Sequence, residues 1–176
     1  MLSEWFSITR TVGLTAYTVT LAACLFRWVQ LRKTGARPGQ LLFLAAVQFM
    51  LLLDMAFDWR WRLHEYWMRQ AITEGVYSER RGPQLFALVG LTIVIIVAVI
   101  VLLFRFRHQK GLALAFTGTL LSIGLCVGEA ISYHYADIVL HATIGGAMVV
   151  SFLWCGLSAI TCLGLWVYDA KPIRKL

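Results

Sequence analysis

Five long stretches without a charged residue constrain this chain more than any other feature of its sequence. They are Thr11–Phe26, Pro38–Leu53, Gln84–Phe104, Gly111–Gly128 and Ala142–Tyr168. The hydrocarbon core of a membrane is about 30 Å thick, and a helix needs about 20 apolar residues to cross it. The third and fifth stretches reach that length alone, and the others reach it when a flanking charged side chain extends to the membrane surface. The chain is therefore expected to cross a membrane several times.

The composition excludes an ordinary water-soluble protein. Hydrophobic residues make up 60% of the 176 residues and charged residues only 14%, whereas soluble domains are about 45–50% apolar and about 25% charged. The net charge of +7 could suggest a nucleic-acid partner, but the basic residues lie at the ends of the apolar stretches. No phosphate-binding glycine loop is present. We expect the partner of this surface to be the lipid bilayer, with neither nucleic acid nor nucleotide bound.

The sequence predicts an all-α fold, a polytopic integral membrane helical bundle that forms one domain over residues 1–176. The five transmembrane helices are expected near residues 8–30, 39–58, 84–104, 111–133 and 141–168. A single helix from Gly111 to Tyr168 would be ~87 Å long at 1.5 Å per residue, which is nearly three bilayers. A break in the helix is therefore required near Tyr133–Asp137.

The placement of charge predicts the orientation in the membrane. With the N-terminus outside, the inner segments hold ten Lys and Arg residues and one acidic residue, whereas the outer segments hold six Arg and eight acidic residues. Lys and Arg are enriched in the cytoplasmic loops of membrane proteins. We therefore expect the N-terminus outside and the C-terminus in the cytoplasm, in a multi-pass protein of the cell inner membrane.

The segment 59–83 is the largest hydrophilic part of the chain and is predicted to begin as an amphipathic helix on the outer membrane surface. Charged residues of alternating sign recur every three or four positions and so share one helical face: Asp58, Arg62, Glu65 and Arg69. Apolar and aromatic residues lie toward another face: Trp59, Leu63, Tyr66 and Trp67. This pattern is typical of a helix that lies at a membrane surface.

Two clusters of ionisable residues are expected at the same outer depth of the membrane. The first contains Asp54 and Asp58, at the end of the second span, and the second runs from Glu129 to His141 around the predicted helix break. Ionisable residues inside membrane spans are costly and usually mark a functional site. The outer end of the bundle is therefore the expected location of the function.

A transition-metal site is the first hypothesis for this outer end. Two imidazoles and a carboxylate suit copper, zinc or iron, and Asp137 and His141 are one helical turn apart. The candidate ligands are His134, Asp137, His141, Glu129, Asp54 and Asp58. Such a metal would support chemistry on a periplasmic or membrane-soluble small molecule, with His64 or Glu65 as candidate catalytic proton carriers. Whether the protein is an enzyme is left open at this point.

A structural hypothesis explains the same residues without a metal. His134 or Asp137 would cap the helix break, and Glu129 and Asp54 would pair with Arg60 or Arg62 across the bundle. The protein would then be a non-catalytic accessory subunit of a larger membrane complex, of a respiratory or oxygenase type, or a homo-oligomer.

Binding of a quinone is the remaining alternative. A quinone site would use a carboxylate or a histidine near the membrane interface, between aromatic walls. Aromatic residues available for such walls are Trp59, Trp61, Tyr133 and Tyr135. The sequence permits a quinone site but does not by itself indicate one.

Overall fold

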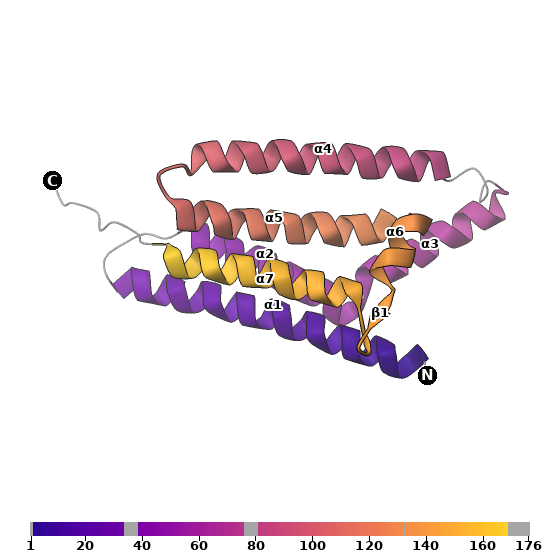
Figure 1. Cartoon of the computed structure of the whole chain (residues 1–176), viewed down its shortest axis with the longest axis horizontal. Helices are drawn as coiled ribbons and strands as arrows, with labels where there is room; N and C mark the ends of the chain where they lie inside the picture. The colour runs from indigo at the N-terminus through magenta and orange to yellow at the C-terminus, as the bar shows by residue number, and fades with distance from the viewer. Residues whose placement is uncertain (1, 34–38, 76–80, 132, 169–176) are drawn as a thin grey trace.

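A computed structural model describes residues 2–33, 39–75, 81–131 and 133–168, with the side chains of residues 2–7 and of His134 left out. Seven helices and one hairpin follow each other along these residues. They are α1 (Leu2–Lys33), α2 (Gly39–Phe57), α3 (Trp59–Thr73), α4 (Arg81–Arg105), α5 (Lys110–Ile131), α6 (His134–Leu140), β1 (Thr143–Ile144), β2 (Ala147–Met148) and α7 (Val149–Val167). The predicted all-α class is confirmed (Figure 1).

Five of these helices are long and apolar enough to cross a membrane, in agreement with the prediction of five spans. They cover Ile8–Lys33 of α1 and the whole of α2, α4, α5 and α7. The last span is shorter than expected, because α7 begins at Val149 and not near residue 141. The required break lies between α5 and α6, and a second interruption follows α6.

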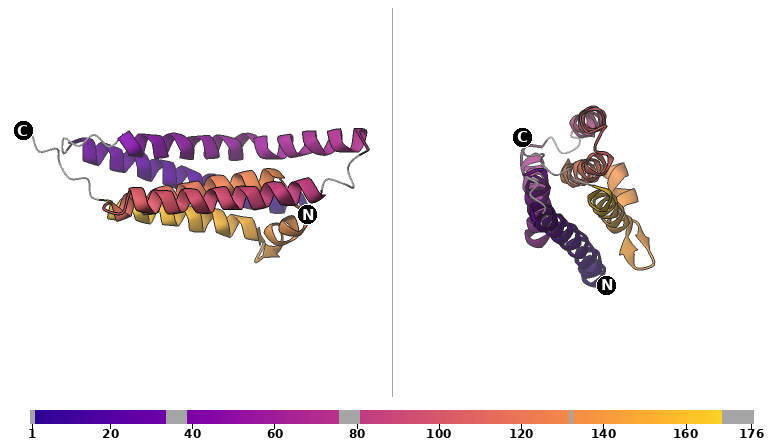
Figure 2. Two further views of the ribbon diagram at one scale, coloured as in Figure 1. Left: turned by 90° about the horizontal axis from the view of Figure 1, so that it is seen from above. Right: turned by 90° about the vertical axis from the view of Figure 1, so that its left-hand side faces the viewer.

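The spanning helices form two layers, as the end-on view in Figure 2 shows. Helices α1 and α2 pack against each other in one layer, and α4, α5 and α7 make the second. Contacts of α1 with α7 and of α2 with α5 join the layers. No residue of α4 is buried, and this helix packs mainly on α5 at the edge of the bundle. The core is thus a four-helix bundle with α4 on its outside.

The two ends of the bundle differ in charge. We call the end with Arg27, Arg32 and Arg105 the basic end, and the end with Asp54 and Glu129 the acidic end. A buried apolar cluster fills each half, around Leu41 and Leu44 of α2 toward the basic end and around Met55 and Trp154 toward the acidic end. This core fixes the helices that carry the charged residues at either end.

Small residues let α5 approach its neighbours on two sides. A Cβ atom built on Gly164 of α7 would lie 2.3 Å from the backbone nitrogen of Ala115. On the other side, a Cβ atom on Gly124 would lie 2.2 Å from Cδ1 of Ile95 in α4. Close backbone approach at small residues is how helices associate in membranes without a hydrophobic driving force.

Gly145 and Gly146 form the turn of a hairpin and do not lie inside the last span. Strands β1 and β2 pair antiparallel, with Ile144 opposite Ala147. Both glycines have positive φ values, 58° and 92°, as the tightest two-residue hairpin turns require. The turn explains why α7 begins later than the apolar pattern predicts.

Substitution of Gly164 by valine should destabilise the bundle, because its new atoms would collide with the backbone of α5. Overpacking of this kind costs about 1–3 kcal/mol, so the unfolding temperature in detergent should fall by about 3–10 °C. Gly156→Val, on the same helix, is the control, since no atom lies within 4 Å of a Cβ at that position. Equal melting temperatures for the two variants would contradict the close α5–α7 contact.

Candidate functional site

The buried guanidinium of Arg60 is the centre of the acidic end. Arg60 is 5% exposed, and its Nε donates to Oδ2 of Asp54 at 2.6 Å. Its Nη1 donates to Oε2 of Glu129 on α5, and its Cζ lies 5.4 Å from the ring centroid of Trp154 on α7. One side chain therefore ties α3 to α2, α5 and α7.

The local sequence explains how Arg60 reaches the interior. Asp58 adopts a left-handed conformation, with φ 54°, which ends α2 and lets α3 leave in a new direction. Asp and Asn tolerate this conformation better than most residues. Oδ1 of Asp54 accepts a hydrogen bond from the backbone N–H of Arg60 at 3.1 Å. Asp54 thus satisfies a free N–H in the first turn of α3 and holds the guanidinium of the same residue.

A second arginine, Arg10 of α1, binds the junction between α2 and α3 at the acidic end. Nη1 of Arg10 lies 3.1 Å from Oδ2 of Asp58, and Nη2 of Arg10 donates to the backbone oxygen of Ala56. The carbonyls in the last turn of a helix have no partner within the helix. Arg10 therefore places a cation at the C-terminus of α2, where the helix dipole favours it, and joins α1 to the α2–α3 junction.

The electrostatics of the cluster keep Arg60 charged. Burial by itself lowers the pKa of its guanidinium, but the carboxylates of Glu129 and Asp54 raise the pKa by more, so it lies above the usual value. The thiol of Cys126 donates to Oδ2 of Asp54 at 3.5 Å. The carboxylates of Glu129 and Asp54 therefore keep the buried guanidinium ionised.

A small cavity of about 30 Å³ lies beside this network. It is lined by Thr9, Arg10, Met55, Asp58, Arg60, Trp61, Glu129, His141, Met148, Val150 and Trp154. Two buried polar atoms of the network, Nη2 of Arg60 and Oε1 of Glu129, make no hydrogen bond to any residue that the structure describes. A cavity of this size holds about one water molecule. It is too small for an organic substrate.

The structure brings some of the predicted site residues together. Asp54 and Glu129 meet at Arg60, as the structural hypothesis expected.

The charged residues predicted on one face of α3 pair differently. Asp58 pairs with Arg10 of α1 and not with a residue of that face. Of the predicted alternating ion pairs on that face, Glu65 and Arg69 form one at 3.0 Å, and both are exposed. The proton-carrier candidate Glu65 thus lies on the surface, and His64 lies in a separate groove described below.

The remaining metal-ligand candidates lie on α6 and at its C-terminal cap, His141. The backbone N–H of His141 donates to the carbonyl oxygen of Asp137 at 2.9 Å, and the His141 ring lies 5.4 Å from that of Trp61. The side chain of His134 is outside the described residues. Among the described side chains, no group of three or more His, Cys, Asp and Glu residues is arranged to hold a metal ion. Binding of copper, zinc or iron stays a prediction.

A larger opening, which we call the α3–α4 groove, lies on the other side of α3. Its volume is about 500 Å³. It is lined by Leu63, His64, Trp67, Met68, Ala71, Pro83, Gln84, Ala87, Val127, Ala130 and Ile131. The walls are apolar except for His64 and Gln84, and Nε2 of Gln84 donates to the carbonyl of Ile131 at the end of α5.

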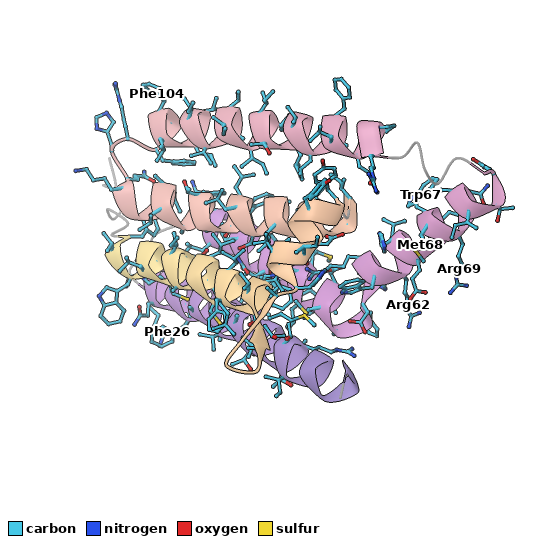
Figure 3. The ribbon with its side chains drawn as sticks, turned by 45° about the vertical axis from the view of Figure 1, so that its right-hand side comes forward. Phe26, Arg62, Trp67, Met68, Arg69 and Phe104 are labelled. Carbon is cyan, nitrogen blue, oxygen red and sulfur yellow. The ribbon has the colours of Figure 1, made fainter. Side chains whose placement is uncertain are left out.

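The side of α3 that faces this groove is aromatic, and its opposite side is charged (Figure 3). In Figure 3, Trp67 lies on the side of α3 toward α4, whereas Arg62 and Arg69 lie on the opposite side. The aromatic residues that we expected around a quinone pair elsewhere: Trp59 stacks on Phe57, Trp61 lies beside His141, and Tyr133 lies beside Tyr135. The aromatic residue of the groove is Trp67, which the pattern of the sequence predicted only to lie on an apolar helix face.

Comparison with known proteins gave no match: no family model, curated protein or solved structure is significantly similar to this chain. The geometry of the acidic end and of the α3–α4 groove is therefore the basis for any statement about function.

Replacement of Arg60 by glutamine should destabilise the protein strongly, because it leaves two buried carboxylates without a cation. Removal of one partner of a buried ion pair costs about 3–5 kcal/mol. Arg62→Gln, on the exposed side of the same helix, should change the free energy of unfolding by no more than about 0.5 kcal/mol. Denaturant unfolding in detergent micelles measures both.

A double variant checks that charge is the cause of this effect. Glu129→Gln in the Arg60→Gln background removes one of the two uncompensated charges and should recover part of the lost stability. If the double variant is less stable than Arg60→Gln alone, packing and not charge pairing is the main role of Arg60.

Proposed function

We propose that this chain binds an amphipathic, membrane-soluble molecule of the isoprenoid-quinone class in the α3–α4 groove. The observation that carries the proposal is the groove itself, about 500 Å³ in volume. Sites for small organic molecules are typically clefts of roughly 300–1,000 Å³ with mostly apolar walls and a few polar groups. The cavity beside Arg60 is far below this range.

The lining residues favour a flat ring with polar edges. Trp67 offers an aromatic face, and aromatic rings stack or pack edge to face with a gain of about 0.5–1.5 kcal/mol beyond area burial. His64 has a ring nitrogen that can donate to a carbonyl oxygen of the ligand. The apolar walls from α4 and α5, such as Ala87 and Val127, lead toward the lipid and suit an isoprenoid tail.

The Arg60 network supports a preformed groove. Arg60 fixes the start of α3 to three other helices, and Trp61 packs on His141 beyond it. Helix α3 then extends past the ends of the spanning helices (Figure 1). A wall that is held in place before the ligand arrives lowers the ordering cost of binding.

The distribution of charge supports an orientation with the acidic end, and so the groove, outside the cytoplasm. Lys and Arg are concentrated at the basic end, which is the cytoplasmic side by the positive-inside rule. In this orientation the protein is a multi-pass protein of the inner membrane, with the groove at the outer membrane surface. Amphipathic molecules that diffuse within the bilayer can enter it from the side.

A ring-stacking variant tests the proposed ligand. Trp67→Ala should weaken binding of a short-chain isoprenoid quinone by about tenfold, a change of about 1.4 kcal/mol, because the aromatic wall is lost. Trp59→Ala is the matched control, since this tryptophan lies on the same helix but stacks on Phe57 outside the groove. Equilibrium binding to protein in lipid nanodiscs measures both affinities.

A bulky side chain placed in the α3–α4 groove gives a second test, measured by photolabelling. Ala87→Trp should block labelling by a photoreactive quinone, whereas Val94→Trp, at an exposed position of the same helix, should leave labelling unchanged. An isoprenoid alcohol of the same chain length, without the ring, should compete poorly. Labelling that persists in Ala87→Trp, or equal competition by the alcohol, would overturn the proposal.

A further inference from the structure

A second groove runs along the contact between α1 and α7, away from the site described above. Its part near the basic end has a volume of about 560 Å³ and its part toward the bundle middle about 430 Å³. The two parts share Val19 and Cys162. The two parts adjoin at these residues, and we call them together the α1–α7 groove.

Arg27 lies at the basic end of this groove without a carboxylate partner among the described residues. Its Nη1 donates to Oε1 of Gln30 at 3.0 Å, and its Nη2 donates to the backbone oxygen of Tyr168. Its Nε is buried and has no hydrogen-bond partner in the described part of the chain. Within the described part of the chain, the side chain is thus held in place by neutral acceptors, and no carboxylate there balances its positive charge.

Exposed aromatic side chains flank this guanidinium. Phe26 is 64% and Trp166 83% exposed, and both line the groove together with Arg27. Figure 3 shows Phe26 pointing away from the bundle at the basic end. Aromatic side chains, and tryptophan above all, are enriched at the level of the lipid headgroups, which places Arg27 at the depth of the lipid phosphates.

From Arg27 the groove continues into the membrane over small and apolar residues. Its walls toward the middle include Val12, Ala16 and Ala159. The distance from Arg27 to Val12 along α1 is roughly 22 Å at 1.5 Å per residue, which exceeds the thickness of one leaflet, about 15 Å. The groove is long enough for an acyl chain below a headgroup bound at Arg27.

We propose that the α1–α7 groove is a binding site for one anionic phospholipid. The phosphate would accept hydrogen bonds from the Arg27 guanidinium, and one acyl chain would lie between α1 and α7. Charge complementarity favours an anionic lipid over a zwitterionic one, since basic pockets between helices bind anionic headgroups. The apolar length of the groove favours a lipid over a free phosphate ion. This site is independent of the quinone proposal.

Native mass spectrometry of the full chain in mild detergent tests the headgroup. The protein should retain one phosphatidylglycerol about fivefold better than a phosphatidylcholine with the same acyl chains. Arg27→Gln should abolish this preference, whereas Arg105→Gln, at the basic end but outside the groove, should keep it. An equal loss in both variants would overturn the proposal, because it would indicate nonspecific attraction to the basic end.

A second pair of variants tests the acyl chain without a change of charge. Ala159→Trp should reduce the retained phosphatidylglycerol to the level of Arg27→Gln, whereas Phe152→Trp, also exposed on α7 but outside the groove, should have no effect. Glycerol phosphate, which has the headgroup chemistry but no chains, should not displace the lipid. Displacement by glycerol phosphate, or full retention in Ala159→Trp, would contradict a lipid site.

Discussion

The pairing of Arg60 with Asp54 and Glu129 is the interaction on which the acidic end of this protein depends. A charge inside a membrane protein is costly unless it is paired and hydrogen-bonded. Here Arg60 is 5% exposed, and its guanidinium is paired with two carboxylates from two different helices. Because the pair is satisfied only when α2, α3 and α5 are in register, it fixes the position of α3, and with it the wall of the α3–α4 groove.

The spans could be predicted from the sequence because they follow from one local property. An uncharged stretch of sufficient length must form a helix in lipid, since every backbone polar group needs a partner there. The boundaries are less certain, and the last span illustrates why. Ala142–Met148 is as free of charged residues as the helix that follows, but Gly145 and Gly146 adopt positive φ values that form a hairpin. Hydropathy does not distinguish these two conformations.

The site could be predicted only in part, because its contacts join residues far apart in the chain. The sequence located the acidic end and offered Arg60 or Arg62 as partners for Glu129, but helix α3 must be placed before one of them is chosen. Arg10 and Trp154 were missed. The position of Arg10 directly before the first apolar stretch was a usable signal, whereas Trp154 was indistinguishable from other aromatic residues within spans.

The charged residues at the two ends of the bundle have different partners. At the acidic end, Asp54, Asp58 and Glu129 are all paired with arginines of the same chain. At the basic end, Arg32 and Arg105 pack on aromatic rings, without a carboxylate partner among the described residues.

This difference has a physical consequence for the membrane. Carboxylates that are paired with arginines of the same chain act weakly on lipid headgroups, whereas arginines with no carboxylate partner among the described residues attract anionic phosphates over about one Debye length. This difference agrees with the proposed orientation, in which the basic end lies at the anionic cytoplasmic surface of the bilayer.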